Sequence, residues 1–203
     1  MARRKTQKPA EDHPAHWIMG VVLSFIAFIA LPDLRPLTGL IFLGALIGLP
    51  FSLYAHKRRR ARTLALSDLR ALTHRELELH VAQVIDALPG WSARANRGTS
   101  DQGADVIATA PGGVKVAVQV KHYTNKLGNK AVQEVVASKA IYGCAHAVVF
   151  TSGPGYTKAA VELAGANKVP LWTAPDLFRL QEAARIGKGM PRDLLPHAGD
   201  WLG

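Results

Sequence analysis

The chain has 203 residues, of which 48% are hydrophobic, and a formal net charge of +10 at pH 7. This length and composition exclude a disordered chain and allow one ordinary domain with additional segments. The single cysteine, Cys144, excludes an intramolecular disulfide, the absence of paired Cys/His spacing argues against a zinc site, and a reducing compartment is the simpler interpretation.

The positive charge is concentrated near the N-terminus. Residues 1–62 hold ten Lys/Arg against three Asp/Glu, whereas residues 63–203 hold fifteen against twelve. Because most of the excess lies outside the predicted globular part, the net charge by itself does not indicate a protein that binds nucleic acid.

Two apolar segments come first along the chain. Residues 17–31 and 37–55 contain no charged residue, and the short polar turn PDLRP separates them. About 20 helical residues span a bilayer core, so the first segment needs flanking residues to cross it. Both segments are apolar all round, which favours a transmembrane helical hairpin. Two alternatives are a pair of core helices in a soluble protein and a cleaved signal peptide, the latter disfavoured by the second apolar run.

Basic residues flank this hairpin on both outer sides. Four precede the first segment within residues 3–8, and five follow the second within residues 57–62, while the turn carries only Arg35. By the positive-inside rule, both ends face the cytoplasm. The sequence therefore predicts a multi-pass protein of the inner (cytoplasmic) membrane, with both termini and residues 63–203 in the cytoplasm. The basic run KRRRAR is also suited to anionic membrane lipid.

The remaining residues alternate helical and strand patterns. After a linker around residues 63–72, hydrophobic periodicity and breaker residues predict nine elements. They are a helix at 73–88, strands at 91–95, 105–110 and 114–120, a helix at 129–142, a strand at 146–150, a helix at 157–166, a strand at 168–172 and a helix at 175–186, the last followed by a loose tail. This order predicts an α/β fold with a mixed sheet and helices on both faces.

The stretch DVIATAPGGVKVAVQVK, residues 105–121, is predicted to be a β-hairpin that turns at residues 111–113. Side chains alternate along a strand, so Gln119 and Lys121 share one face. A three-residue turn with glycine in the left-handed position pairs Asp105 with Gln119, although one bulge would shift this register. An acid, an amide and an amine are then expected to converge at one end of the hairpin.

Such a trio suits phosphodiester hydrolysis. Mg²⁺ prefers oxygen ligands, which the Asp105 carboxylate and the Gln119 amide can supply. Lys121 can orient the attacking water and offset charge that develops on the phosphate. A further carboxylate is expected from the first helix, where Glu78 aligns with the buried face and Glu76 with the solvated one. A solvated sheet face is the competing interpretation of the trio.

The predicted hairpin and the residues around it resemble a known protein family. The segment GTSDQGADVIATAPGGVKVAVQVKHYTNKLGNKAVQEV, residues 98–135, resembles the core of the Mrr-type restriction endonucleases of the PD-(D/E)xK nuclease superfamily. The similarity begins near residues 75–91 and continues through residues 147–172, which is about half of the chain. It implies a restriction-endonuclease-like sheet with an αβββαβ core.

The resemblance also implies roles for individual residues. It implies a Mg²⁺-dependent DNA endonuclease, with Mn²⁺ as a substitute, in which Asp105, Gln119 and Glu78 are metal ligands and Lys121 is the catalytic lysine. Gln119 replaces the usual acid of the superfamily, which lowers the negative charge of the site. Residues that follow the motif are candidates for DNA contact. They are Gln133, Lys126, Lys130, His122 and Tyr123.

The chain thus divides into five predicted parts. They are a basic N-terminal tail (1–16), a transmembrane hairpin (17–55), a basic juxtamembrane linker (56–72), a Mrr-like nuclease domain (73–186) and a C-terminal tail (187–203). The leading function is a membrane-anchored DNA endonuclease of restriction or repair type that needs no small-molecule cofactor. The alternatives are a non-catalytic DNA-binding module and a lipid-facing structural protein. Cutting two strands makes a homodimer plausible.

Overall fold

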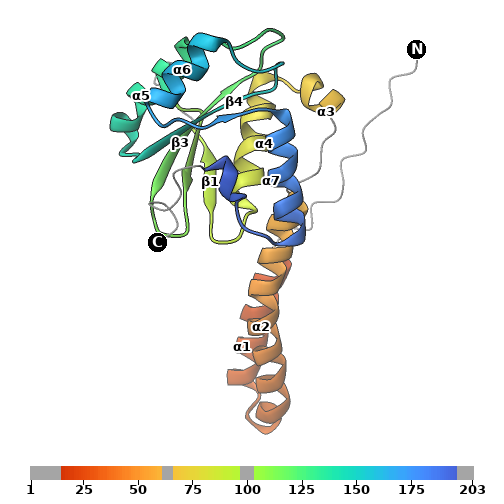
Figure 1. Ribbon diagram of the computed structural model, residues 1–203. Coiled ribbons are helices and arrows are strands. Elements are labelled where there is room, and N and C mark those ends of the chain that lie inside the picture. Colours follow the sequence, from red (N-terminus) through yellow and green to blue (C-terminus); the bar gives the residue numbers. More distant parts are fainter. Residues whose placement is uncertain (1–14, 61–65, 97–102, 196–203) are drawn as a thin grey trace, which may run out of the picture. The chain divides into compact units, whose positions relative to one another are not determined.

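The computed structural model describes residues 15–60, 66–96 and 103–195. The chain separates into two compact units, residues 1–57 and residues 58–203, and each is considered by itself. Figure 1 shows the helices and strands of both units.

The first unit is a helical hairpin. Helix α1 (Ala15–Ala30) and helix α2 (Arg35–Arg60) are joined by the short helix η1 (Pro32–Leu34). The rings of Phe25 and Phe42 pack with their centroids 5.4 Å apart. A Cβ on Gly39 would lie 3.3 Å from the ring of Phe28, so this glycine allows the two helices to approach closely.

Large apolar side chains of the hairpin point outward. Among its described residues, many leucines and isoleucines, together with Phe25, are about half exposed. The exposed fraction of Leu40 reaches 70%. The polar side chains of Ser24 and Thr38 hydrogen-bond to carbonyls of their own helices. Within the described residues, one helical segment, Pro32–Pro50, is long and apolar enough to cross a membrane, and Ile18–Ala30 is a shorter apolar helix.

The second unit is an α/β domain whose core order is αβββαβ, as expected (Figure 1). Its helices are α3 (Leu66–Ala71), α4 (His74–Asp86), α5 (Lys130–Tyr142), α6 (Lys158–Ala166), α7 (Ala174–Ile186) and η2 (Arg192–Leu194). Its strands are β1 (Ser92–Ala95), β2 (Val106–Thr109), β3 (Lys115–Lys121), β4 (His146–Thr151) and β5 (Leu171–Trp172).

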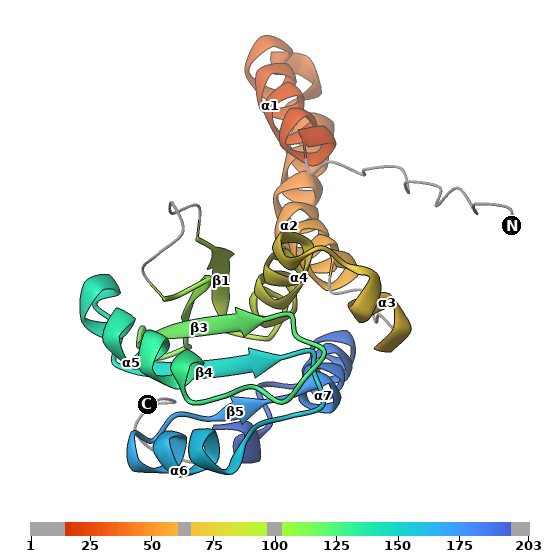
Figure 2. The same ribbon diagram turned by 90° about the horizontal axis from the view of Figure 1, so that it is seen from above.

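The five strands form one mixed sheet in the order β1-β2-β3-β4-β5. Strands β1, β2 and β3 are antiparallel neighbours, whereas β3, β4 and β5 run parallel. Parallel neighbours need crossover connections, which α5 and α6 supply. Figure 2 shows α5 and α6 on one face of the sheet and α7 on the other. This confirms the predicted mixed sheet with helices on both faces.

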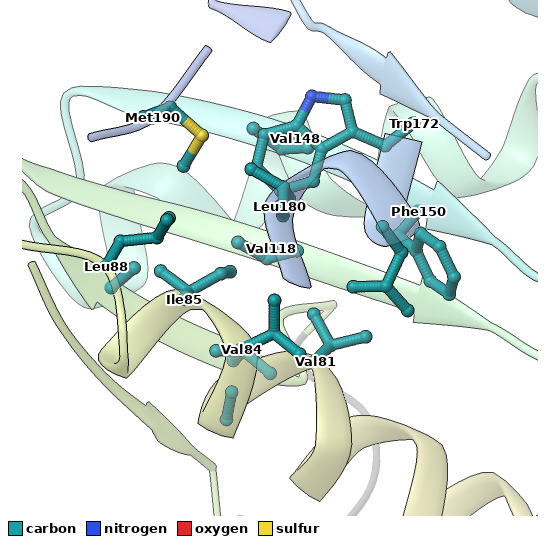
Figure 3. Packing of buried hydrophobic residues seen from close by; sticks show 14 of the residues in the cluster. Val81, Val84, Ile85, Leu88, Val118, Val148, Phe150, Trp172, Leu180 and Met190 are labelled. Carbon is teal, nitrogen blue, oxygen red and sulfur yellow. The ribbon is translucent and has the colours of Figure 1, made fainter. Parts of the chain in front are cut away.

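The two faces of the sheet have separate cores. Even-numbered residues of β3, such as Val118 and Val120, pack with α4 and α7 in the larger core, where Figure 3 shows Val81, Phe150 and Leu180. Odd-numbered Ala117 packs with α5 and α6 in the smaller core, which is richer in alanine and valine. The alternation of side chains along β3 therefore divides it between two layers.

Two segments expected to be irregular contain structure. The linker prediction missed α3, where Leu69 is fully buried in the larger core. The loose-tail prediction is wrong for residues 190–195, because Met190, Leu194 and Leu195 are buried there and the Trp172 indole N–H donates to the Leu194 carbonyl at 2.9 Å. In both segments, isolated apolar residues contribute to the core without a periodic pattern. Residues 196–203 lie outside the described part of the chain.

Candidate active site

The β2–β3 hairpin places Asp105 and Gln119 opposite each other. Val106 pairs with Val118, and the Asp105 N–H donates to the Val118 carbonyl at 3.0 Å, so the predicted register is confirmed. Gly113 in the turn has φ +80°, which is the left-handed position that the register requires. No bulge shifts the strands between the turn and the site.

Asp105 lies at the centre of the cluster. Its Oδ2 accepts hydrogen bonds from the Gln119 amide at 2.5 Å and from the Val120 N–H at 2.7 Å. Burial raises the pKa of the Asp105 carboxyl and the nearby Glu78 carboxylate adds to this, while the Val120 N–H and Lys121 lower it. The carboxyl is therefore held in place by one oxygen, in surroundings where a positive partner would be favourable.

Gln119 is 3% exposed and turns its amide nitrogen toward Asp105. Its Oε1 is buried and has no hydrogen-bond partner among the described residues. A half-turn of the amide about its last side-chain bond exchanges these two atoms, which would present an oxygen to the carboxylate. The two oxygens would repel each other unless a cation lay between them.

Helix α4 brings Glu78 to the same place. Glu78 is 8% exposed, and its Oε2 pairs with the Arg75 guanidinium at 2.6 Å while its Oε1 lies 3.2 Å from His74 Nε2. Glu76 instead forms a capping box with Thr73 at the start of α4. Helical periodicity therefore assigned the two acids to the correct faces of the helix.

Lys121 is placed by an acid that the sequence analysis did not identify. Its Nζ lies 2.9 Å from Glu134 Oε2 on α5, and both side chains are half-buried. Gln133, which was predicted to contact the site or DNA, is exposed and lies one residue away from the acid. On α5 the buried residues include Ala131, and Glu134 lies about 60° from it on the helix, whereas Gln133 lies on the opposite side. The same helical argument that chose Glu78 would have found Glu134.

Close backbone approaches fix the elements around Lys121. Gly103 has φ +71°, and a Cβ there would lie 2.5 Å from the Glu134 carbonyl oxygen. A Cβ on Gly153 would lie 2.7 Å from the Tyr123 carbonyl oxygen. Any larger residue at these positions would push α5, or the loop that follows β3, away from the sheet.

The remaining residues predicted to contact DNA lie in the loop after β3 and at the start of α5. Tyr123, Lys126 and Lys130 are exposed, and Lys130 Nζ lies 3.9 Å from Glu134 Oε1. His122 is half-buried, with its Nδ1 2.7 Å from the Ser152 hydroxyl. These residues follow Lys121 along the chain, and of them Lys130 reaches toward Glu134, the partner of Lys121.

The residues fit a divalent cation. His74, Glu78 and Asp105 each offer a ligand atom, and these atoms lie within 4.8 Å of one another. Carboxylates and imidazole are common ligands of divalent ions.

The structure thus combines a mixed sheet with an acid, an amide and a lysine near the end of β3. The family model for the Mrr catalytic domain, described as a restriction endonuclease, matches residues 69–181. This match covers more than half of the chain, which therefore belongs to the Mrr-type restriction endonuclease family and is a DNA endonuclease. No curated protein matches the chain.

Proposed function

We propose that the chain is a membrane-anchored DNA endonuclease whose catalytic centre consists of Asp105, Gln119, Lys121 and Glu78 and depends on Mg²⁺, with Mn²⁺ as a substitute. The observation that carries this proposal is the convergence of β3 and α4 on Asp105, with Gln119 and Glu78 at its carboxyl and Lys121 nearby. Catalysis by such a site consists mainly of positioning and charge stabilisation.

Each residue has a separate task in this mechanism. Asp105 and Glu78 would hold the cation, and the Gln119 amide oxygen would be a further ligand. A bound cation supplies Lewis-acid stabilisation of the phosphate and lowers the pKa of its water. Lys121 orients the attacking water and stabilises negative charge on the scissile phosphate. The bond between phosphorus and one ester oxygen breaks as the bond from the water oxygen forms, and the leaving oxygen takes up a proton.

The loop after β3 is proposed to hold the DNA backbone. Tyr123, Lys126 and Lys130 are exposed in the segment that follows Lys121, as phosphate and sugar contacts require. Each lysine that neutralises a phosphate should add about one unit to the slope of log affinity against log salt. Lys126→Ala and Lys130→Ala should each reduce that slope without changing which DNA sequences are bound. An unchanged slope would exclude this surface.

The hairpin of residues 17–55 is proposed to anchor residues 73–186 to the cytoplasmic side of the inner membrane. Its outward leucines and isoleucines, together with polar groups satisfied within their own helices, support this proposal. The basic residues on both outer sides support the orientation.

The topology can be tested with single cysteines, since Cys144 is buried. Asp33→Cys in the turn should react with a membrane-impermeant maleimide in intact cells, and Ser67→Cys on α3 only after lysis. Wild type is the control for labelling of Cys144. Labelling of both positions in lysed cells only would exclude the two-pass topology.

The catalytic proposal is tested by cleavage of supercoiled plasmid by the full chain in detergent. Mg²⁺ or Mn²⁺ should support cleavage, EDTA should stop it, and Asp105→Ala should abolish it. Undiminished cleavage by Asp105→Ala would contradict the proposed site.

A homodimer is also proposed, because both strands must be cut. It predicts that the rate of double-strand cleavage rises with the square of protein concentration.

A further inference from the structure

The cluster at the start of α4 contains a histidine that the proposed catalytic centre does not use. His74 Nε2 lies 3.2 Å from Glu78 Oε1, one helical turn away along α4. Two neighbouring ligands of an octahedral ion at about 2.1 Å lie about 3 Å apart, so the two atoms already have the spacing of adjacent ligands. All three ligand atoms of His74, Glu78 and Asp105 lie within 4.8 Å of one another.

In each of the two carboxylates, one oxygen is bound by protein groups that lie outside the cluster of three ligands. Glu78 uses Oε2 for Arg75, which also donates to the Asn96 carbonyl at 2.8 Å, and this leaves Oε1 beside His74. Asp105 uses Oδ2 for the Gln119 amide and the Val120 N–H. Each acid is thus oriented through one oxygen while its other oxygen remains available for an ion.

Two further observations support a ligand at this place. Gln119 is 97% buried, its amide touches Asp105, and its Oε1 has no partner among the described residues. The capping box of Thr73 and Glu76 fixes the first turn of α4, so the backbone of His74 is held in position. After a half-turn of the Gln119 amide, a bound ion would provide the missing partner for the buried oxygen.

We propose that His74 is a ligand of the metal centre, which is therefore a mixed nitrogen and oxygen site that binds first-row transition ions more tightly than Mg²⁺. This inference rests on the proposed function and deepens it. Imidazole nitrogen binds transition ions well and Mg²⁺ poorly, whereas carboxylate oxygen suits both. His74 would thus add affinity for Co²⁺ or Mn²⁺ and little for Mg²⁺.

The test measures metal binding without DNA. The full chain in detergent is titrated with Co²⁺, whose visible absorption reports its ligands, and Mg²⁺ affinity is measured by calorimetry. His74→Ala should lose about tenfold or more in Co²⁺ affinity and keep its Mg²⁺ affinity within about twofold. Pulsed EPR of the Mn²⁺ form should show a ligand nitrogen in wild type and not in His74→Ala. His146→Ala, at the far end of β4, is the matched histidine control.

Three results would overturn the inference. Equal losses of Co²⁺ and Mg²⁺ affinity would mean that His74 only orients Glu78. Unchanged Co²⁺ affinity in His74→Ala would remove the imidazole from the site, and unchanged Co²⁺ affinity in Asp105→Ala would place the ion elsewhere. Failure of the nuclease proposal is seen separately, as a wild-type protein that binds metal and cleaves no DNA.

Discussion

The two faces of the sheet differ in how they are packed and in what they bring to the site. The α4 and α7 face buries many large side chains, and it positions Glu78 and His74. The α5 and α6 face has smaller core residues, and it positions Glu134 against Lys121. Asp105 lies between these two groups of residues. In the proposed mechanism, one layer therefore holds the cation ligands while the other positions the lysine.

Among substitutions that affect one face of the sheet, the largest effect should come from removing the carboxylate that α4 contributes. Glu78→Ala removes a buried carboxylate from the cation site, so we expect plasmid cleavage to fall about a hundredfold and Mg²⁺ affinity to fall with it. Glu76→Ala is the matched control. It should reduce the free energy of unfolding by about 1 kcal/mol through loss of the capping box, with cleavage retained. Equal losses of cleavage in the two variants would contradict the assignment.

The next largest effect is expected at Gly103, where the backbone passes close to α5. Gly103→Ala combines a strained backbone at φ +71° with a contact of 2.5 Å to the Glu134 carbonyl oxygen. We expect it to lower the free energy of unfolding by about 2 to 3 kcal/mol and to reduce cleavage by displacing Glu134. Gly113→Ala has φ +80° and open space around its Cβ, and should cost about 1 kcal/mol with cleavage unchanged. Urea unfolding and plasmid cleavage would check both, and identical behaviour would show that the close approach does not matter.

A smaller effect should separate the lysine from the metal. Glu134→Gln removes the charge that holds Lys121 at 2.9 Å, so we expect the cleavage rate to fall about tenfold at saturating Mg²⁺, with metal affinity unchanged. Glu162→Gln, on the exposed face of α6, should behave as wild type. If Glu134→Gln instead lost metal affinity, the two faces would not have separate tasks.

The smallest effect concerns the pH dependence of the free energy of unfolding, through a buried tyrosine on the α5 and α6 side of the sheet. The Tyr156 hydroxyl donates to the Val149 and Trp172 carbonyls, and burial raises the pKa of this phenol above its usual range. Above about pH 10 the unfolded chain loses a proton that the folded chain keeps, so the free energy of unfolding should fall as pH rises. Tyr156→Phe should be less stable at pH 7 by about 1 to 2 kcal/mol and should lose less above pH 10.

Urea unfolding at several pH values measures this difference. Tyr123→Phe, at an exposed phenol, should parallel wild type at every pH. Parallel curves for Tyr156→Phe and wild type would mean that the buried phenol does not contribute to the alkaline loss.

Much of the fold followed from periodicity in the sequence. The alternation in β3 predicted the two faces, and the glycine turn predicted the pairing of Asp105 with Gln119, because strand geometry is local. Helix α3 and the packing of Leu194 did not follow, since single buried residues leave no periodic pattern.

The site was predicted in part for the same physical reason. Glu78 follows from its place on an amphipathic helix, and so would Glu134 if α5 had been treated in the same way. The pairing of Glu134 with Lys121 joins a helix and a strand through tertiary packing, which no local pattern encodes. The cluster with His74 likewise depends on how α4 meets the end of β2.

The most direct test of the account compares two lysines on one strand. Lys115 and Lys121 share a face of β3 at its opposite ends. Plasmid cleavage and DNA retention at low salt would be measured for each alanine variant of the full chain. We predict wild-type cleavage by Lys115→Ala, and for Lys121→Ala a cleavage rate about a thousandfold lower with DNA still bound. Wild-type cleavage by Lys121→Ala, or a wild-type chain that holds DNA without cutting it in Mg²⁺ or Mn²⁺, would contradict it.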